Sequence, residues 1–137
     1  MTKKCECEPF QSCDACGLVS IEIDPCAKPR QTRRDVWQQR PAVMKYRAFA
    51  DELRLRFKAL NLSLGEKLDC VFVLPMPKSW PKKKKDEMSG KPHKQKPDID
   101  NLAKAVQDAL CKEDSHVWQH RTEKIWGETG MIIFRSF

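Results

Sequence analysis

The sequence predicts an α/β (α+β) domain in which a small mixed sheet of about four strands packs against two main helices. Three observations lead to this prediction. Stretches rich in β-branched and aromatic residues occur near both ends and in the middle of the chain. Two other stretches repeat apolar residues at spacings of three and four, as amphipathic helices do. A chain of 137 residues suits one domain with a modest core.

The first half of the chain predicts a strand, a helix and a second strand. Residues 17–24 alternate apolar and polar side chains, which is typical of a half-buried strand. Pro41 begins a helix that runs to about residue 61, because proline at the first helical position loses no hydrogen bond. The apolar side chains expected to face the core from this helix are Ala42, Tyr46, Phe49, Leu53, Phe57 and Leu60. Residues 67–74 contain a continuous apolar run, which predicts an interior strand covered on both faces.

The second half predicts a basic loop, a helix and two strands. The loop spans residues 78–96, and His93 within it is expected at the surface. A second amphipathic helix begins at Asp98. Residues 115–126 and 131–134 predict the last two strands, which are expected to pair antiparallel with each other across a short turn.

The charge balance favours a polyanionic partner. The formal net charge is +7, which suits nucleic acid or another anionic surface. No apolar run is long enough for a transmembrane helix, so no membrane partner is expected. The first residues lack the apolar core of a secretory signal, and the expected location is the cytoplasm.

Four of the seven cysteines lie within the first sixteen positions. These are Cys5, Cys7, Cys13 and Cys16. In a reducing compartment such a cluster favours a metal site over disulfides, and the Cys-x-x-Cys pair suits tetrahedral Zn²⁺. Residues 1–16 therefore predict a small zinc knuckle, for which Cys26 is a substitute ligand. An iron–sulfur cluster and a tail with incidental thiols are the alternatives.

Two basic segments suit contacts with phosphates. The first follows the first strand, and the second is a lysine-rich arm in which residues 81–88 have the composition of a short helix. The predicted DNA-contacting residues are Lys28, Arg30, Arg33, Arg34, Lys82, Lys83, Lys84, Lys85, Lys94 and Lys96. The alternative interpretation is that both segments are solvated loops.

The start of the second helix carries two carboxylates, Asp98 and Asp100. N-capping and the helix dipole would explain either of them alone. Placing residues 100° apart puts Asp100, Lys104 and Asp108 on one face, opposite the apolar side. Two close carboxylates repel each other unless a cation or proton lies between them. Bound Mg²⁺ would remove that repulsion, and it prefers oxygen ligands.

Glu113 and Asp114 follow the helix and supply the candidate third carboxylate. A short connection is expected to bring Asp114 beside Asp98 and Asp100, with Glu113 as the alternative. Three carboxylates would form a divalent-metal site for phosphoryl chemistry. Lys104 would contact the scissile phosphate, stabilise the leaving group or orient the water.

The sequence Lys96-Pro-Asp-Ile-Asp-Asn-Leu-Ala-Lys104, continued to Glu113-Asp114, resembles the signature of the RusA family of Holliday-junction resolvases. Residues 29–32 and 40–41 are also similar to phage and prophage members, and the resemblance covers residue 19 to the end. It implies that Asp98, Asp100 and Asp114 bind metal and that Lys104 is an essential lysine. It also implies a Mg²⁺-dependent homodimer that makes paired, symmetric nicks in four-way DNA junctions during recombination and repair, without a small-molecule cofactor.

The predicted organisation is a cysteine-rich extension, residues 1–16, followed by a RusA-like nuclease domain, residues 17–137. Two other functions remain open at this stage. One is a non-catalytic, zinc-containing DNA-binding protein. The other is a metal-dependent nuclease that acts on forks or flaps.

Overall fold

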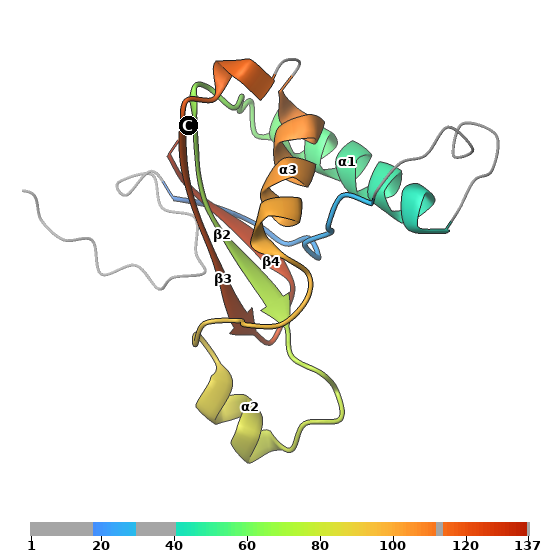
Figure 1. Ribbon diagram of the computed structural model, residues 1–137, viewed down its shortest axis with the longest axis vertical. Helices are drawn as coiled ribbons and strands as arrows, with labels where there is room; N and C mark the ends of the chain where they lie inside the picture. The colour runs from blue at the N-terminus through green and yellow to red at the C-terminus, as the bar shows by residue number, and fades with distance from the viewer. Residues whose placement is uncertain (1–17, 30–40, 112–113, 137) are drawn as a thin grey trace, which may run out of the picture.

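The computed structural model describes residues 18–29, 41–111 and 114–136 (Figure 1). The elements, in chain order, are β1 (Val19–Ile21), α1 (Pro41–Ala59), β2 (Lys67–Pro75), α2 (Lys82–Met88), α3 (Ile99–Leu110), the 3₁₀ turn η2 (Asp114–His116), β3 (Gln119–Gly127) and β4 (Met131–Ser136). This order confirms the predicted α+β class and its two main helices. The short helix α2 lies within the predicted basic loop.

The four strands form one mixed sheet in the order β1-β4-β2-β3. β2 pairs parallel with β3 and antiparallel with β4, so the prediction of an interior strand is confirmed. β4 also pairs antiparallel with β1. The predicted pairing of the last two strands with each other is wrong, because β2 lies between them.

Two glycines explain why a short connection can cross the end of β2 instead of closing a hairpin. A Cβ on Gly127 would lie 2.3 Å from Cγ1 of Val73, and one on Gly130 would lie 2.0 Å from Oδ1 of Asp24. The chain can therefore pass closely over its neighbours only because both positions lack a side chain. The Met76 N–H donates to the Gly127 carbonyl at 3.0 Å and ties the end of β2 to this crossing.

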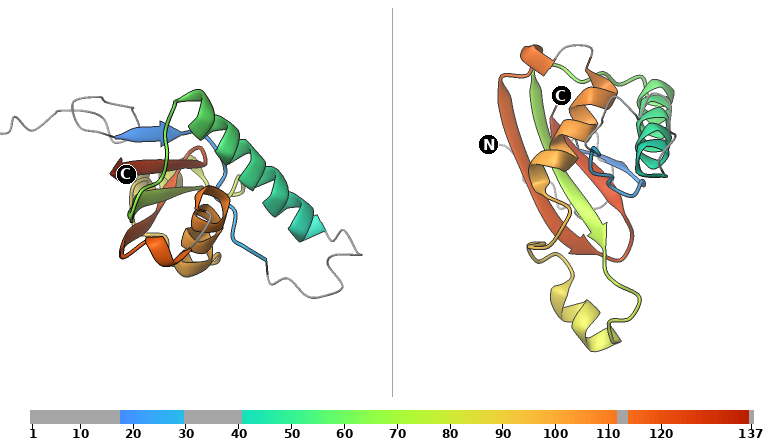
Figure 2. Two further views of the ribbon diagram at one scale, coloured as in Figure 1. Left: turned by 90° about the horizontal axis from the view of Figure 1, so that it is seen from above. Right: turned by 45° about the vertical axis from the view of Figure 1, so that its right-hand side comes forward.

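α1 and α3 lie on the same side of the sheet and bury the main core against it (Figure 2). The side chains of α1 that are buried are Val43, Tyr46, Phe49, Ala50, Leu53 and Phe57. Four of these were predicted. Ala42, in the first turn of α1, and Leu60, just after its last residue, are exposed instead. No helix in the described ranges combines the length and apolar character needed to cross a bilayer.

The other side of the sheet carries a smaller apolar cluster. Val71, Val73 and Ile133 are buried there. Arg135 lies beside them and forms salt bridges with Asp69 at 2.6 Å and with Glu123 at 3.3 Å. Polar side chains thus hold three strands together on the side away from the helices.

Candidate metal and nucleic-acid site

Asp98 and Asp100 lie at the start of α3. Asp98 is the N-cap residue and has extended backbone angles, φ −71° and ψ 143°. Its carbonyl accepts a hydrogen bond from the Leu102 N–H at 3.2 Å, but its carboxylate makes no capping hydrogen bond. Both side chains are exposed, and neither carboxylate is paired with another residue of the described ranges. N-capping therefore does not account for the Asp98 carboxylate.

Lys104 is exposed one turn after Asp100, as the helical wheel predicts. The opposite side of α3 is buried against the sheet and α1 through Leu102, Ala103, Ala105, Val106 and Ala109. Because packing fixes the rotation of the helix, the acidic residues and Lys104 are turned towards the solvent. This surface of α3 can offer two carboxylates and one ammonium group to a ligand.

The backbone of Asp114 lies away from this group within one chain. α3 has 12 residues, which at about 1.5 Å per residue separates its two ends by roughly 18 Å. The backbone of Asp114 lies in η2, beyond the far end of α3 from Asp98 (Figure 1). β3 runs parallel to β2, so the chain has to return to the end at which β2 starts before it can enter β3. That requirement carries Asp114 away from the start of α3. Glu113 lies outside the described residues.

Two exposed carboxylates still fit Mg²⁺. The described ranges contain no group of three His, Cys, Asp or Glu residues that could hold a metal ion. Mg²⁺ is commonly held by one or two carboxylates, and waters and substrate phosphate oxygens complete its shell. Asp98 and Asp100 match that mode of binding.

The segment that leads into α3 is anchored along the free edge of β3. The Gly90 N–H donates to the Trp126 carbonyl at 2.8 Å, and the Trp126 N–H donates to the Lys91 carbonyl at 3.0 Å. The His93 N–H donates to the Lys124 carbonyl at 3.0 Å. The approach to Asp98 therefore follows an ordered strand edge, although its sequence predicted a polar loop.

His93 is buried, with 6% of its surface exposed, so the prediction of a surface histidine is wrong. Its ring centroid lies 4.0 Å from that of Trp126, whose ring is also 4.8 Å from that of Trp80. Its Nδ1 accepts a hydrogen bond from the Gln95 N–H at 3.3 Å. Burial lowers the pKa of His93, and the charge of Lys124 lowers it further. Sequence reasoning missed this environment because Trp126 comes from a strand 33 positions later.

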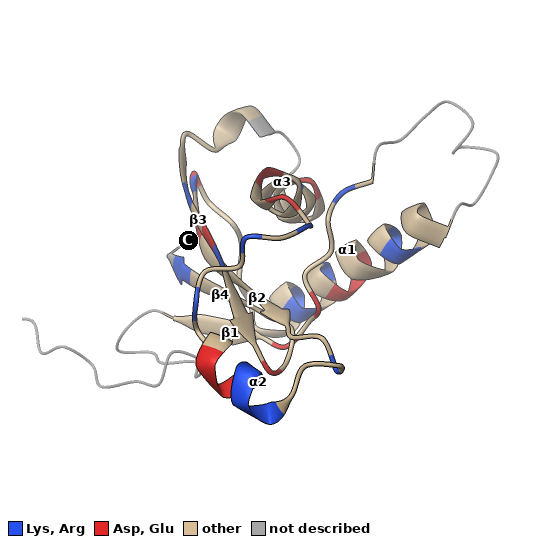
Figure 3. Ribbon diagram, turned by 60° about the horizontal axis from the view of Figure 1, so that its bottom comes forward, with Lys and Arg blue, Asp and Glu red and all other residues tan. Residues whose placement is uncertain are grey.

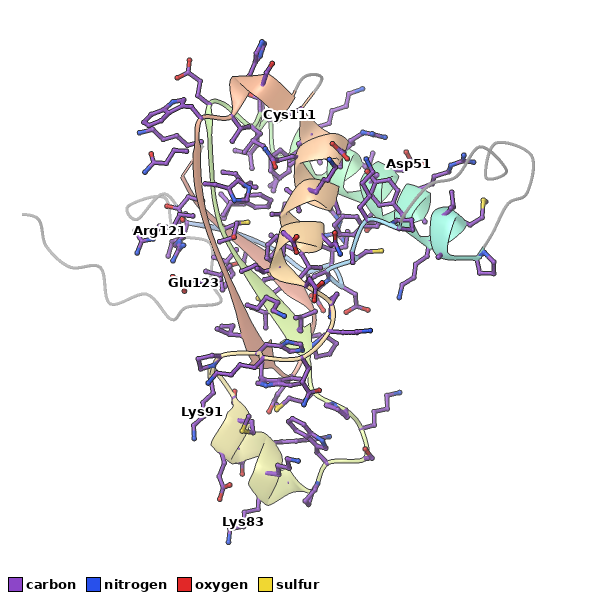
Figure 4. All side chains as sticks on the ribbon, in the orientation of Figure 1. Asp51, Lys83, Lys91, Cys111, Arg121 and Glu123 are labelled. Atoms are coloured by element: carbon purple, nitrogen blue, oxygen red, sulfur yellow. The ribbon has the colours of Figure 1, made fainter. Side chains whose placement is uncertain are left out.

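Lys124 is a residue that sequence reasoning did not single out. Its Nζ donates to the Gln95 carbonyl at 2.6 Å and to the Pro97 carbonyl at 2.7 Å. The register with Phe72 places Lys124 on the side of β3 that faces the helices. Arg121 and Glu123 lie on the opposite side of the strand (Figure 4). The alternation of residues along β3 could have indicated which side of the strand Lys124 faces. It does not indicate that Lys124 donates to two backbone carbonyls.

The predicted basic arm extends from the end of the molecule at which α3 begins. α2 buries none of its residues, and its lysines colour much of its ribbon blue (Figure 3). Lys83 points away from the body of the molecule (Figure 4). The other lysines predicted to contact DNA in this region, all exposed except the half-exposed Lys85, are Lys82, Lys84, Lys85, Lys94 and Lys96. Nζ of Lys84 lies 4.2 Å from the ring centroid of Trp80. The arm thus brings positive charge to the end of the molecule that carries Asp98 and Asp100.

Lys28 is held against α3. Its ammonium group forms a salt bridge with Asp108, and its backbone N–H donates to the Asn101 carbonyl at 3.3 Å. The remaining DNA-contacting residues predicted in this segment lie outside the described residues; they are Arg30, Arg33 and Arg34. The four cysteines of the predicted zinc knuckle also lie outside them; they are Cys5, Cys7, Cys13 and Cys16. Cys26, the substitute ligand, is buried, and burial raises the pKa of its thiol.

One comparison with known proteins matches most of the chain. The family model described as "Endodeoxyribonuclease RusA" matches residues 22–134. No curated protein matches the sequence. The matched stretch includes Asp98, Asp100 and Lys104 and all the described elements except β1 and the last two residues of β4.

Proposed function

We propose that this chain, which belongs to the RusA family of endodeoxyribonucleases, resolves four-way DNA junctions by paired, Mg²⁺-dependent nicks. The family gives the coarser part of this statement: a Holliday-junction-resolving endodeoxyribonuclease, a hydrolase that acts on branched DNA. The metal, the pairing of the nicks and the residues responsible are the proposal. The observation that carries it is the pair of exposed carboxylates at the start of α3, with Lys104 one turn further along.

Asp98 and Asp100 would hold the metal ion. When bound, Mg²⁺ supplies charge that polarises the scissile phosphate and lowers the pKa of a bound water. The two carboxylates are free of capping and of ion pairs within the described ranges, so binding a cation breaks no existing contact there. α3 is packed on its opposite side, which gives both carboxylates a rigid base.

Lys104 would bind the scissile phosphate. Its ammonium group is exposed on the same face as Asp100, and no carboxylate in the described ranges neutralises it. A fixed positive charge beside the phosphate stabilises the additional negative charge that develops during displacement. Stabilisation of the leaving oxygen and orientation of the water are the other roles open to Lys104.

The exposed lysines of the α2 arm would bind the DNA backbone. They lie beyond the end of the sheet at which α3 begins (Figure 1), and Lys82, Lys83 and Lys84 are exposed. Lysines in such positions bind phosphates without reading base sequence. These lysines would bind one duplex of the four-way junction while Asp98, Asp100 and Lys104 on α3 bind the strand to be cut.

The remaining parts of the proposal rest on the family resemblance and on the sequence. Paired nicks imply a homodimer, in which each subunit cuts one strand. The resemblance assigns Asp114 as a third acidic residue, but its backbone lies away from the start of α3 in the single chain, so the proposal places the metal on Asp98 and Asp100 alone. Residues 1–16 are proposed as a separate zinc knuckle, and recombination and repair in the cytoplasm as the setting.

One experiment separates this function from its alternatives. A labelled four-way junction, a linear duplex and a fork are incubated with the protein, with and without Mg²⁺. Paired, symmetric nicks in the junction alone, and only with Mg²⁺, support the proposal. Equal cleavage of the fork would favour a broader metal-dependent nuclease. Junction binding that is indifferent to Mg²⁺ and gives no cleavage would favour a non-catalytic DNA-binding protein.

A further inference from the structure

We infer that Lys124 is a positioning residue, which fixes the backbone that leads into α3 and so sets the placement of the Asp98 and Asp100 carboxylates. This inference rests on the proposed function, because it assigns Lys124 a purpose only if these carboxylates bind a metal. Lys124 is not itself placed in contact with metal or DNA. It acts through the residues that precede Asp98.

The contacts of Lys124 converge on one short segment. Its Nζ donates to the Gln95 carbonyl at 2.6 Å and to the Pro97 carbonyl at 2.7 Å. These two carbonyls flank Lys96, and the residue after Pro97 is Asp98. Charge-assisted hydrogen bonds of this length are roughly twice as strong as neutral ones. One side chain therefore holds both ends of the dipeptide that immediately precedes the candidate metal site.

The backbone of Lys124 holds the same segment from its other end. The Lys124 carbonyl accepts the His93 N–H at 3.0 Å. The ring of His93 packs at a tilt against Trp126, two residues beyond Lys124 in β3. Positions 93, 95 and 97 are thus all connected to Lys124, through one main-chain and two side-chain hydrogen bonds. Because β3 pairs with the interior strand β2 along nine residues, this support is part of the rigid sheet.

An ammonium group suits this position better than a neutral side chain does. Two carbonyl oxygens that point at the same place repel each other unless a donor lies between them. Lys has three donors and no acceptor, so it can satisfy both oxygens at once. Lys124 is half-buried and faces the helices, whereas Lys82, Lys83 and Lys84 of α2 are exposed. Its position favours support of the backbone over a direct contact with DNA.

The consequence for catalysis follows from the precision that a metal site needs. Reacting groups have to be held within about 0.5 Å, and a misplacement of about 1 Å can lower the rate about 100-fold. Replacing Lys124 would remove two hydrogen bonds that hold the Gln95–Pro97 backbone in place. The packing of the apolar side of α3 against the sheet would not change. The Asp98 and Asp100 carboxylates would then be present but less well placed.

Three variants test the inference. Lys124→Met removes the ammonium group and keeps the apolar stem. Lys124→Arg keeps a cation that can reach both carbonyls. Lys58→Met, an exposed lysine of α1, is the matched control for loss of one positive charge. Thermal unfolding by circular dichroism establishes that all three variants fold.

The first readout is independent of activity. Amide hydrogen exchange of peptides covering residues 94–102 is expected to be faster in Lys124→Met than in wild type, and unchanged in Lys58→Met. Lys124→Arg should restore most of the protection. Equal exchange in Lys124→Met and Lys58→Met would overturn the inference. This comparison stays decisive even if the wild-type protein fails to nick junctions, an outcome that would refute only the proposed function.

The second readout is kinetic. Lys124→Met is expected to lower kcat for junction nicking by roughly 10- to 100-fold and to raise the Mg²⁺ concentration for half-maximal rate. Its junction affinity without Mg²⁺ should match that of Lys58→Met, and Lys124→Arg should recover most of kcat. A loss confined to KM and to junction affinity would show that Lys124 contacts DNA, and would reject the positioning role.

Discussion

Lys28 and Asp108 form a salt bridge that joins the segment after β1 to the solvent-facing side of α3. The two residues are 80 positions apart in the sequence, and their side chains are only 27% and 16% exposed. Asp108 lies on the predicted face with Asp100 and Lys104, but its charge is balanced by Lys28. The predicted role of Lys28 in DNA binding stays a prediction. Its ammonium group already forms a salt bridge with Asp108.

The salt bridge is expected to contribute to stability rather than to catalysis. Asp108→Asn leaves the partly buried ammonium group of Lys28 without its counter-charge, and should lower the free energy of unfolding by about 1–2 kcal/mol. Removing both charges in Lys28→Met/Asp108→Asn should cost less than the sum of the single changes. Urea denaturation of the four proteins in this cycle measures the coupling. A coupling energy of zero would show that the pair contributes nothing.

The carboxylates of Asp98 and Asp100 are expected to be essential for nicking. Asp100→Asn or Asp98→Asn removes a metal ligand, and should lower the nicking rate at least about 100-fold, which corresponds to about 3 kcal/mol in the barrier. Junction binding without metal should persist or tighten, because a negative charge beside the phosphates is gone. Single-turnover cleavage and a gel-shift titration measure the two effects. Asp51→Asn, an exposed carboxylate of α1, is the control. Normal cleavage by Asp100→Asn in Mg²⁺ would reject the assignment of the site.

The position of Asp114 leads to a different expectation. Its backbone lies beyond the far end of α3, a helix about 18 Å long, so Asp114→Asn should nick junctions at nearly the wild-type rate. The same single-turnover assay compares it directly with Asp100→Asn. If both variants are equally inactive, the resemblance assigns Asp114 correctly, and η2 must reach the site from the partner subunit of the proposed dimer or in another conformation.

Patterns of neighbouring residues predicted the helices and strands of this fold. The features that these patterns did not predict depend on contacts between segments far apart in the sequence. The periodicity of α1 and α3 is a property of neighbouring residues, so the buried faces of both helices could be anticipated. The grouping of Asp98, Asp100 and Lys104 was also found, because all three lie within two turns of one helix. A single sequence carries these spacings directly.

The errors share one physical origin. The pairing of β4 with β2 depends on how closely Gly130 can pass Asp24, which no local pattern reveals. The burial of His93 depends on Trp126, which lies 33 positions later in the chain. Each of these relationships joins segments far apart in the chain, where spacing along the sequence gives no information.

The lysines of α2 are expected to control the salt dependence of DNA binding. Replacing Lys82, Lys83, Lys84 and Lys85 by Gln should weaken junction binding at low salt. The slope of log K against log salt should fall by about 0.9 for each lysine that contacts a phosphate. Fluorescence anisotropy at several salt concentrations measures it. Stability should hardly change, because α2 buries none of its residues. Lys45→Gln/Lys58→Gln on α1 is the control, and an unchanged slope in the α2 variant would exclude the arm from the DNA interface.

His93 is expected to make the stability of the protein depend on pH. Burial and the charge of Lys124 lower its pKa in the folded state, whereas the unfolded chain has the ordinary value of about 6.5. The unfolded state therefore binds more protons just below that pH, and the free energy of unfolding should fall as the pH drops below about 6.5, at up to about 1.4 kcal/mol per pH unit. Protonation also removes the Nδ1 acceptor that the Gln95 N–H uses.

His93→Phe tests this dependence because it keeps a ring against Trp126 but cannot titrate. At pH 7.5 the variant should lose about 1 kcal/mol of stability with the Gln95 hydrogen bond. Between pH 6.5 and 5.5 its stability should fall less steeply than that of wild type, because the group with the lowered pKa is gone. Urea denaturation at the three pH values gives the slopes. Parallel slopes for wild type and His93→Phe would mean that His93 keeps an ordinary pKa, and that its burial does not restrict its protonation.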